Sequence, residues 1–440
     1  MTAGRSLRLG DTVDLTVEKG VYRGLGLARH EGQVVFVTRG VPGDRVRARV
    51  ASVRKGYVRA RPESLLVASP DRRDPPCPLF AACGGCAYQH VAYEGQLRLK
   101  EGILRESLQR AGRPWGDPIE VVPSPEQGWR TRVRLHLELR DGRFRLGLYE
   151  EASHRVVDLD ACLQMSPALL GAARDLLAGF AAEPHLARGV SEVALAESGD
   201  GQTRVAALFR DGAPAGGTGL SSLATAGPWL TGLGLVAGGD GGGGRYVGLA
   251  GEPWIENEAA GQRYRSHVLS FFQANRHLLD PFVRRVRDWT TRGAPVLDLY
   301  GGVGLFSLAL AEGAPAVTAI EQDPRSAADA EENARRAGRA NVRTLRGDVG
   351  EVLGALPEQP GEEIVLDPPR AGAGPAIVRQ IAERRPAGVV YVSCDPTTLG
   401  RDLAVFAAQG YEPDRLAAFD MFPDTFHLET IVRLTPRRTL

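Results

Sequence analysis

The C-terminal part of the chain alternates short apolar runs with segments of helical periodicity. The apolar runs occupy residues 296–299, 316–320, 363–366 and 388–392. Strands made almost entirely of apolar residues are buried on both faces, and this burial requires helices on both sides of a mainly parallel sheet. We therefore predict a doubly wound, Rossmann-like α/β domain over residues 266–440.

The N-terminal part has a different pattern, with apolar and polar residues alternating between glycines. Residues 13–17, 33–37, 45–50 and 57–60 carry it. Period two predicts four or five strands, and so short a segment is expected to close as a small barrel of the oligonucleotide-binding kind over residues 1–68. Residues 1–70 hold 13 Lys and Arg against 6 Asp and Glu, whereas the whole chain carries only +1. The basic excess suits nucleic acid, and a solvated basic surface is the alternative.

Residues 69–265 are expected to form a central, β-rich domain. Apolar residues at helical spacing predict a helix over residues 93–113, which should pack on the C-terminal domain of residues 266–440. The glycine-rich tract over residues 232–251 is expected to be a flexible surface loop.

Four cysteines have the spacing of a metal or cluster site. Cys77, Cys83 and Cys86 lie close together, and Cys162 follows 76 residues later. Four thiolates suit a tetrahedral zinc ion or an iron–sulfur cube, and the spacing alone does not decide between them. Disulfides and unrelated thiols are the alternatives, but no signal-peptide pattern opens the chain, and a reducing cytosol disfavours disulfides. The glycines between Cys83 and Cys86 are expected to supply positive φ angles around the ligand.

Glycines follow the first strand of the C-terminal domain, where the backbone can approach a nucleotide-like ligand. Gly301, Gly302 and Gly304 form this turn, and Glu321 ends the next strand, where a carboxylate can bind a ribose diol. The spacing departs from that of dinucleotide sites and favours S-adenosylmethionine, although a structural glycine turn would look similar. Asp348 and Asp367 end further strands, so their side chains should face the same crevice.

Cys394 ends another buried strand and precedes a helix start at Pro396. The amide dipoles of that helix should lower the thiol pKa and favour a nucleophilic thiolate. The alternative is a buried structural cysteine.

These motifs together resemble the bacterial class I RNA uracil-5-methyltransferases, specifically the 23S ribosomal RNA branch with a TRAM barrel and a [4Fe–4S] site. The resemblance covers nearly the whole chain. It is carried by the cysteine loop with Cys162, Ser270-Phe-Phe-Gln-Ala-Asn275, Asp298-Leu-Tyr-Gly-Gly-Val-Gly304, Asp367-Pro-Pro-Arg370, Ser393-Cys-Asp-Pro396 and Phe422-Pro-Asp-Thr-Phe-His-Leu-Glu429.

The resemblance implies specific roles for these residues. Cys394 would attack C6 of a flipped uracil, and Glu429 would remove the C5 proton after methyl transfer. The implied cofactor contacts are Gln273, Tyr300, Gly302, Glu321, Asp348 and Asp367. The implied cluster ligands are Cys77, Cys83, Cys86 and Cys162.

The expected substrate is 23S ribosomal RNA, because transfer-RNA enzymes of this class typically lack both the barrel and the cluster. Two alternatives of other classes are a radical methylthiotransferase, whose Cys-x3-Cys-x2-Cys cradle is absent here, and a non-catalytic RNA-binding protein. No apolar run approaches the ~20 residues needed to span a bilayer, so we expect a soluble, cytoplasmic protein with no membrane association and no obligate protein partner.

Overall fold

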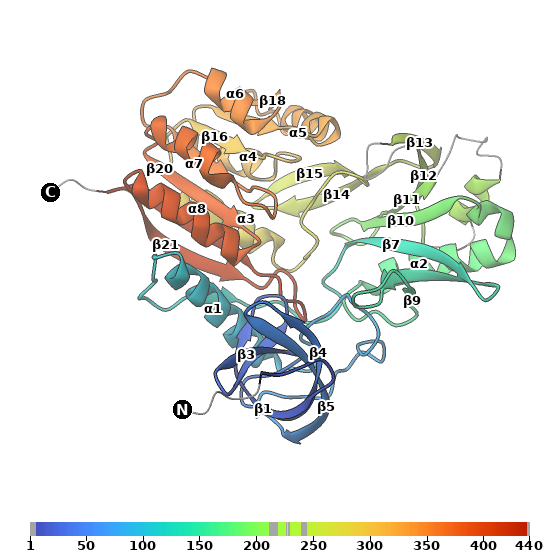
Figure 1. The fold of residues 1–440 in the computed structure, drawn as a ribbon. Helices are drawn as coiled ribbons and strands as arrows, with labels where there is room; N and C mark the ends of the chain where they lie inside the picture. The colour runs from blue at the N-terminus through green and yellow to red at the C-terminus, as the bar shows by residue number, and fades with distance from the viewer. Residues whose placement is uncertain (1–5, 211–218, 226, 228, 239–243, 438–440) are drawn as a thin grey trace.

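The computed structural model describes residues 6–210, 219–225, 227, 229–238 and 244–437. It contains a small barrel, a central sheet and a larger sheet covered by helices on both faces (Figure 1). The barrel lies below the larger sheet in this view, and the central sheet extends to one side.

Five strands close the N-terminal barrel in the order β1-β2-β3-β5-β4. Its strands are β1 (Thr12–Val21), β2 (Leu25–His30), β3 (Gln33–Thr38), β4 (Arg45–Arg54) and β5 (Tyr57–Val67). Alternate residues such as Val13, Leu15 and Val17 point into its core, as period two predicts. The prediction of a small barrel is confirmed. No pattern had indicated β2, whose Gly26 is required because a Cβ there would lie 2.8 Å from the carbonyl oxygen of Gly40.

The central sheet has the strand order β13-β12-β11-β10-β7-β8-β9. Helix α2 contacts β8 and β10, and its apolar residues share one core with theirs. The elements of this part are β7 (Arg132–Arg140), β8 (Arg143–Tyr149), β9 (Val156–Asp158), α2 (Pro167–Ala182), β10 (Val190–Glu197), β11 (Arg204–Arg210), β12 (Gly232–Ala237), β13 (Arg245–Ala250) and the 3-10 turns Pro184–Ala187 and Leu220–Thr225.

The glycine-rich tract is not a loop throughout, so that prediction is wrong. Its two ends form β12 and β13, and every residue of β12 is buried. Glycine is needed there because a Cβ on Gly232 would lie 2.4 Å from the carbonyl oxygen of Glu252, and one on Gly234 would lie 2.2 Å from the Tyr246 ring. Residues 239–243 of the tract lie outside the described residues.

The largest sheet has the order β18-β17-β16-β19-β20-β22-β21-β6. Strands β16 to β20 are parallel, whereas β22 runs antiparallel to β20 and β21. The strands are β6 (Glu120–Val122), β16 (Val296–Leu299), β17 (Val317–Glu321), β18 (Val342–Arg346), β19 (Glu363–Leu366), β20 (Gly388–Ser393), β21 (Tyr411–Phe419) and β22 (Glu429–Pro436).

Two apolar cores lie on opposite faces of this sheet, which confirms the predicted α/β architecture. One core includes residues of α3 and α4, and the other includes residues of α1, α6, α7 and α8. The helices are α1 (Tyr93–Arg110), α3 (Leu279–Trp289), α4 (Leu305–Leu310), α5 (Pro324–Arg336), α6 (Val349–Ala355), α7 (Gly374–Glu383) and α8 (Pro396–Ala408).

Two early elements join this C-terminal layer. Helix α1 packs on α8, and β6 pairs with β21 and forms one edge of the sheet. Helix α1 ends at Arg110, three residues before the predicted end, since Gly112 has a φ of 72° and Pro114 follows it. The hairpin of β14 (Trp254–Ala259) and β15 (Gln262–His267) packs on α5 and α3. Among the described residues, no helix is long and apolar enough to cross a membrane.

Candidate active site

A cleft of about 650 Å³ opens at the carboxyl edge of the parallel strands. Ligands of open α/β sheets bind at this edge. The cleft is lined by every residue for which the sequence suggested a catalytic or cofactor-binding role: Gln273, Tyr300, Gly302, Glu321, Asp348, Asp367, Cys394 and Glu429. The sequence motifs therefore converge on one cavity, although they span 157 positions from Gln273 to Glu429.

Cys394 and Glu429 lie at the same end of two neighbouring strands, β20 and β22. Strands β20 and β22 pair antiparallel, with Ser393 opposite Thr430. Cys394 is the next residue after β20, and Glu429 is the first residue of β22. The same ladder therefore places the thiol and the carboxyl group at one end of the pair.

A tight turn after β16 forms the floor of the cleft. Tyr300 has a φ of 62°, an uncommon value for a residue with a side chain, and Gly302 and Gly304 also have positive φ. The Gly302 amide donates to a carboxylate oxygen of Glu321 at 2.8 Å, which fixes the turn against the end of β17. A Cβ on Gly302 would meet no atom within 4 Å, so the turn leaves open space on its cleft side.

Several buried polar atoms in or beside the cleft have no partner within the described residues. They are Oε1 of Gln273, Oε2 of Glu429 and Oδ1 of Asp298. Buried polar atoms are normally hydrogen-bonded, so unpaired atoms around one cavity are expected where a polar ligand binds. Asp348 caps α6 by accepting from the Gly350 amide at 2.8 Å, and its exposed side chain borders the same cleft.

The expectation of a lowered thiol pKa at Cys394 is wrong for the free protein. Burial, together with the negative charges of Glu429 and Asp367, raises the pKa of Cys394 from 9.0 to about 12. The amides at the start of α8 donate instead to Asp395, which caps the helix. Arg370 acts in the opposite direction but does not offset the burial. Cys394 is therefore a neutral thiol at pH 7 in the free protein.

The neighbouring carboxyl groups are also shifted towards their neutral forms. Burial and the charge of Asp367 raise the pKa of Glu429 well above its usual range. Burial, together with the charge of Asp298, raises the pKa of Asp367 to about 7. Pairs of acidic groups in a buried site share protons, and such sites carry acid and base chemistry near neutral pH.

Three residues in or near the cleft have no role in the sequence-based predictions. Arg370 Nη2 lies 3.3 Å from His427 Nε2, and burial beside this arginine lowers the pKa of His427 to about 4. Both residues occur in the motifs, but no spacing rule marks them.

Tyr22 belongs to the barrel, and its ring contacts Phe426 with 5.4 Å between centroids. The charge of Asp395 contributes to raising the pKa of Tyr22, so the barrel reaches the vicinity of Cys394.

The four cysteines of the predicted metal site line one small cavity. All are free thiols, and burial raises the pKa of Cys77, Cys83 and Cys86. A bound cation would therefore favour the thiolate forms of Cys77, Cys83 and Cys86. Within the described ranges, no three His, Cys, Asp or Glu side chains stand in an arrangement that holds a metal ion. The donor set suits a cluster, whereas its presence stays a prediction.

The cysteine loop uses its glycines differently from the expectation. Neither Gly84 nor Gly85 has a positive φ. They are required by close packing, because a Cβ on Gly84 would lie 3.0 Å from the Tyr149 carbonyl oxygen and one on Gly85 would lie 2.6 Å from Leu148. The loop therefore packs closely against the end of β8.

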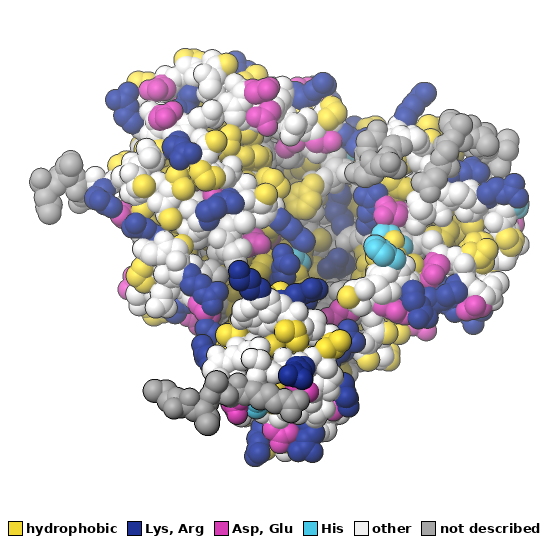
Figure 2. Space-filling model, in the orientation of Figure 1, with side chains coloured by type: hydrophobic (Ala, Val, Ile, Leu, Met, Phe, Trp, Pro, Cys, Tyr) yellow, Lys and Arg dark blue, Asp and Glu magenta, His cyan; other side chains and the backbone are white. Residues whose placement is uncertain are grey.

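A hollow separates the barrel, the central sheet and the C-terminal layer, and Lys and Arg side chains gather around it (Figure 2). This arrangement suits a polyanion that contacts all three parts.

Comparison with known proteins gives a consistent family assignment. Residues 256–437 match the family described as tRNA (uracil-5-)-methyltransferase, and residues 7–62 match the TRAM domain. The RNA methyltransferase BH0687 of Halalkalibacterium halodurans is 32% identical over 449 residues, covering 96% of this chain and 97% of that protein. The 23S rRNA (uracil(1939)-C(5))-methyltransferase RlmD of Shewanella amazonensis is 31% identical over 429 residues, covering 96% and 95%.

Among solved structures, the Pyrococcus abyssi tRNA (uracil-54, C5)-methyltransferase in complex with S-adenosyl-L-homocysteine is similar over almost its whole length. The TM-score is 0.76 at 25% identity, covering 96% of this chain and 99% of that one. The family match, the barrel match and the full-length relatives agree with the motifs that line the cleft. The chain belongs to the RNA uracil-5-methyltransferase family and carries an N-terminal TRAM domain.

Proposed function

We propose that this protein transfers a methyl group from S-adenosylmethionine to C5 of a uridine in RNA, with 23S ribosomal RNA as the substrate. The observation that carries the proposal is the placement of Cys394 and Glu429 at one end of the β20–β22 ladder, inside the cleft that also holds the cofactor motifs. A thiol and a carboxyl group so placed match the two chemical tasks of C5 methylation.

S-adenosylmethionine would supply an electrophilic methyl group. Gln273 and Tyr300 would contact it from the loop before α3 and from the turn after β16, and Gly302 would let the backbone approach. Glu321 would accept hydrogen bonds from a ribose diol, Asp348 would border the adenine, and Asp367 would face the amino-acid end. The unpaired Oε1 of buried Gln273 supports a polar ligand there.

The uracil ring needs activation because its C5 is a poor nucleophile. In the proposed mechanism the Cys394 thiol loses its proton to solvent, and Sγ forms a bond to C6, which pushes electron density onto C5. C5 then takes the methyl group as the bond between that group and the sulfonium sulfur breaks, which releases S-adenosylhomocysteine. Glu429 accepts the C5 proton, and the electron pair left behind reforms the C5–C6 double bond while the C6–S bond breaks. Thiolate and 5-methyluridine are the products.

The raised pKa of Cys394 has a consequence for this order of events. Because Arg370 does not offset the burial of the thiol in the free protein, the added positive charge of a bound sulfonium would favour thiolate formation once the site is filled. This arrangement would protect the nucleophile until both substrates are present.

The target uridine must leave any base stack to reach Cys394. Arginine and lysine side chains around the hollow in Figure 2 would hold the phosphate backbone while one base enters the cleft. We propose that residues 1–68 act as the RNA-binding barrel, residues 69–265 as the central domain and residues 266–440 as the catalytic domain. RNA methylation would take place in the cytoplasm.

The choice of 23S ribosomal RNA rests on the full-length similarity to the RlmD protein of Shewanella amazonensis. The expectation that transfer-RNA enzymes of this class lack the barrel is weakened, because the Pyrococcus abyssi tRNA enzyme is similar over 96% of this chain, including the barrel. Transfer RNA is therefore the second candidate substrate, and the similarity to the Pyrococcus abyssi enzyme is the observation in its favour.

We further propose that Cys77, Cys83, Cys86 and Cys162 hold a [4Fe–4S] cluster with a structural or RNA-positioning role. Their shared cavity and the burial of Cys77 and Cys83 support a cluster ligated by all four thiolates, without an open coordination position. An iron and sulfide content near four each per chain after anaerobic purification would support it, and stoichiometric zinc without sulfide would contradict it.

The substrate is tested by incubating the purified protein with labelled S-adenosylmethionine and unmodified 23S ribosomal RNA or unmodified transfer RNA. Nucleoside mass spectrometry then identifies the product. We expect 5-methyluridine in ribosomal RNA alone. Product in transfer RNA alone would overturn the substrate and keep the chemistry, and label in neither RNA would contradict the proposed function.

A further inference from the structure

The segment between β21 and β22 carries the proposed base at its end. It runs from Asp420 to Leu428 and leads directly into Glu429. Asp424, in the middle of this segment, is only 2% exposed and has a φ of 63°. A buried aspartate in the left-handed region persists only where its surroundings hold it there.

Both the backbone and the side chain of Asp424 bind residues outside the C-terminal domain. Its carbonyl oxygen accepts from the amides of Ala87 and Tyr88, each at 2.8 Å. Gln96 binds it twice, since Oε1 accepts from the Asp424 amide at 2.9 Å and Nε2 donates to Asp424 Oδ1 at 3.0 Å. Arg73 Nη2 also donates to Oδ1, at 3.3 Å.

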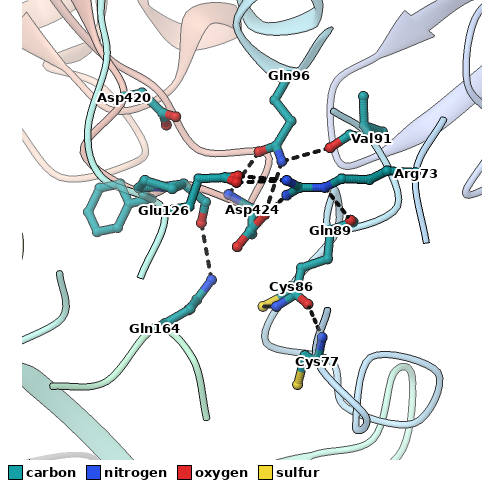
Figure 3. A network of polar contacts seen from close by, with 12 residues as sticks. Arg73, Cys77, Cys86, Gln89, Val91, Gln96, Glu126, Gln164, Asp420 and Asp424 are labelled. Atoms are coloured by element: carbon teal, nitrogen blue, oxygen red, sulfur yellow. Dashed lines mark hydrogen bonds and ion pairs between the residues drawn. The ribbon is translucent and has the colours of Figure 1, made fainter. Parts of the chain in front are cut away.

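These contacts continue to the cysteine loop (Figure 3). Arg73 Nε donates to the carbonyl oxygen of Gln89 at 3.0 Å. The Gln89 side chain accepts from the Cys77 amide at 3.1 Å and donates to Cys86 Sγ at 3.2 Å. A second link starts near Cys162, because Gln164 Nε2 donates to the Pro423 carbonyl oxygen at 3.1 Å. The residues around the four cysteines thus bind the middle of the base-bearing segment from two sides.

We propose that Asp424 is a positioning residue whose buried carboxylate, anchored by Gln96 to α1 and by Arg73 to the cysteine loop, fixes the segment that places Glu429 for proton removal. The inference rests on the proposed role of Glu429. Asp424 touches neither substrate nor cleft, so its effect must pass through the backbone over the four residues that separate it from Glu429.

The chemical step affected is the last one. If Asp424 loses its contacts, the thiol can still add to C6 and C5 can still take the methyl group. Removal of the C5 proton slows, because a displacement of about 1 Å costs on the order of a hundredfold in rate. Methylated RNA should therefore stay bonded to Cys394 for longer.

Asp424→Gly removes all side-chain contacts and suits the φ of 63°. Asp424→Asn keeps an acceptor oxygen for Gln96 and Arg73 and also tolerates this φ. Glu126→Gln serves as the matched control, because Glu126 binds Arg73 through both oxygens at 2.8 Å but does not bind the segment.

The test measures kcat, KM for RNA and for S-adenosylmethionine, and the fraction of protein covalently bound to RNA on a denaturing gel. For Asp424→Gly we expect kcat to fall about 10- to 100-fold with both KM values within twofold of wild type, and the adduct fraction to rise. Asp424→Asn should restore kcat to within a few-fold of wild type, and Glu126→Gln should match wild type.

Wild-type kcat in Asp424→Gly, or a lower kcat with raised KM and no additional adduct, would overturn the inference. If Asp424→Gly is unfolded in a thermal melt, Gln96→Met removes both hydrogen bonds between Gln96 and Asp424 without changing the segment, and the same kcat and adduct signature is expected from it. A wild-type protein that methylates no RNA would instead refute the proposed function, so the two failures are distinguishable.

Discussion

The raised pKa of Cys394 predicts an unusually unreactive nucleophile in the free protein. At pH 8 a thiol with a pKa of about 12 is about a thousandfold less ionised than one with a pKa of 9.0. A more basic thiolate is also a better nucleophile. With a Brønsted slope of about 0.4–0.5, each thiolate should react about 15- to 30-fold faster in thiol–disulfide exchange, which offsets part of the lower ionisation. The net expectation is a reaction about 30- to 60-fold slower than that of an ordinary cysteine peptide.

The assay follows exchange of Cys394 with a small aromatic disulfide from pH 7 to pH 10.5, with the modified peptide quantified by mass spectrometry. The Cys394→Ala protein gives the background from the other four cysteines. Limited access would slow the reaction equally at every pH, so the shape of the profile identifies the cause. We expect the rate to rise tenfold per pH unit without a plateau. A plateau at or below pH 9 would refute the assignment of a raised pKa.

Three further substitutions test other parts of the structure. Glu321→Ala should weaken S-adenosylhomocysteine binding about 10- to 100-fold by titration calorimetry, because a charged acceptor contributes about 1.5–3 kcal/mol; unchanged affinity would exclude Glu321 from the site. Lys100 and Asp420 form an ion pair whose side chains are 1% and 0% exposed. Lys100→Met should therefore lower the free energy of unfolding in urea by about 3–5 kcal/mol, and adding Asp420→Leu should restore most of this stability. A loss below about 1 kcal/mol for Lys100→Met would contradict the burial of the pair. Gly234→Ala should lower the melting temperature because its Cβ would lie 2.2 Å from the Tyr246 ring, and an unchanged melting temperature would argue against a buried β12.

The sequence could predict the cleft because strand ends and motif residues coincide. Each apolar run of the C-terminal part ends at a residue that lines the cleft, such as Asp367 after β19 and Cys394 after β20. Parallel strands bring their carboxyl ends to one edge, so residues far apart in sequence could be placed together without coordinates.

Other features depend on packing that no local pattern contains. The pKa of Cys394 is raised first by burial and then by the charges of Glu429 and Asp367, which lie at the ends of other strands. The local sequence shows only the helix start after Cys394, which would act in the opposite direction. The sequence of β12 predicts a flexible loop because it is rich in glycine. The residues that leave no room for a Cβ at these glycines, such as Tyr246, lie on the next strand and cannot be identified from the local sequence. The contact of Tyr22 with Phe426 joins positions 404 residues apart, so only the folded chain reveals it.

The central claim is that Cys394 bonds to C6 of a uridine whose C5 is then methylated. The most direct test replaces uridine with 5-fluorouridine in the RNA, since the C5 fluorine cannot leave as a proton and the reaction should stop at the covalent stage. After nuclease and protease digestion, mass spectrometry should find the Cys394 peptide carrying a nucleotide that has gained one methyl group. An adduct on another residue, or methylated RNA without any adduct, would contradict the account.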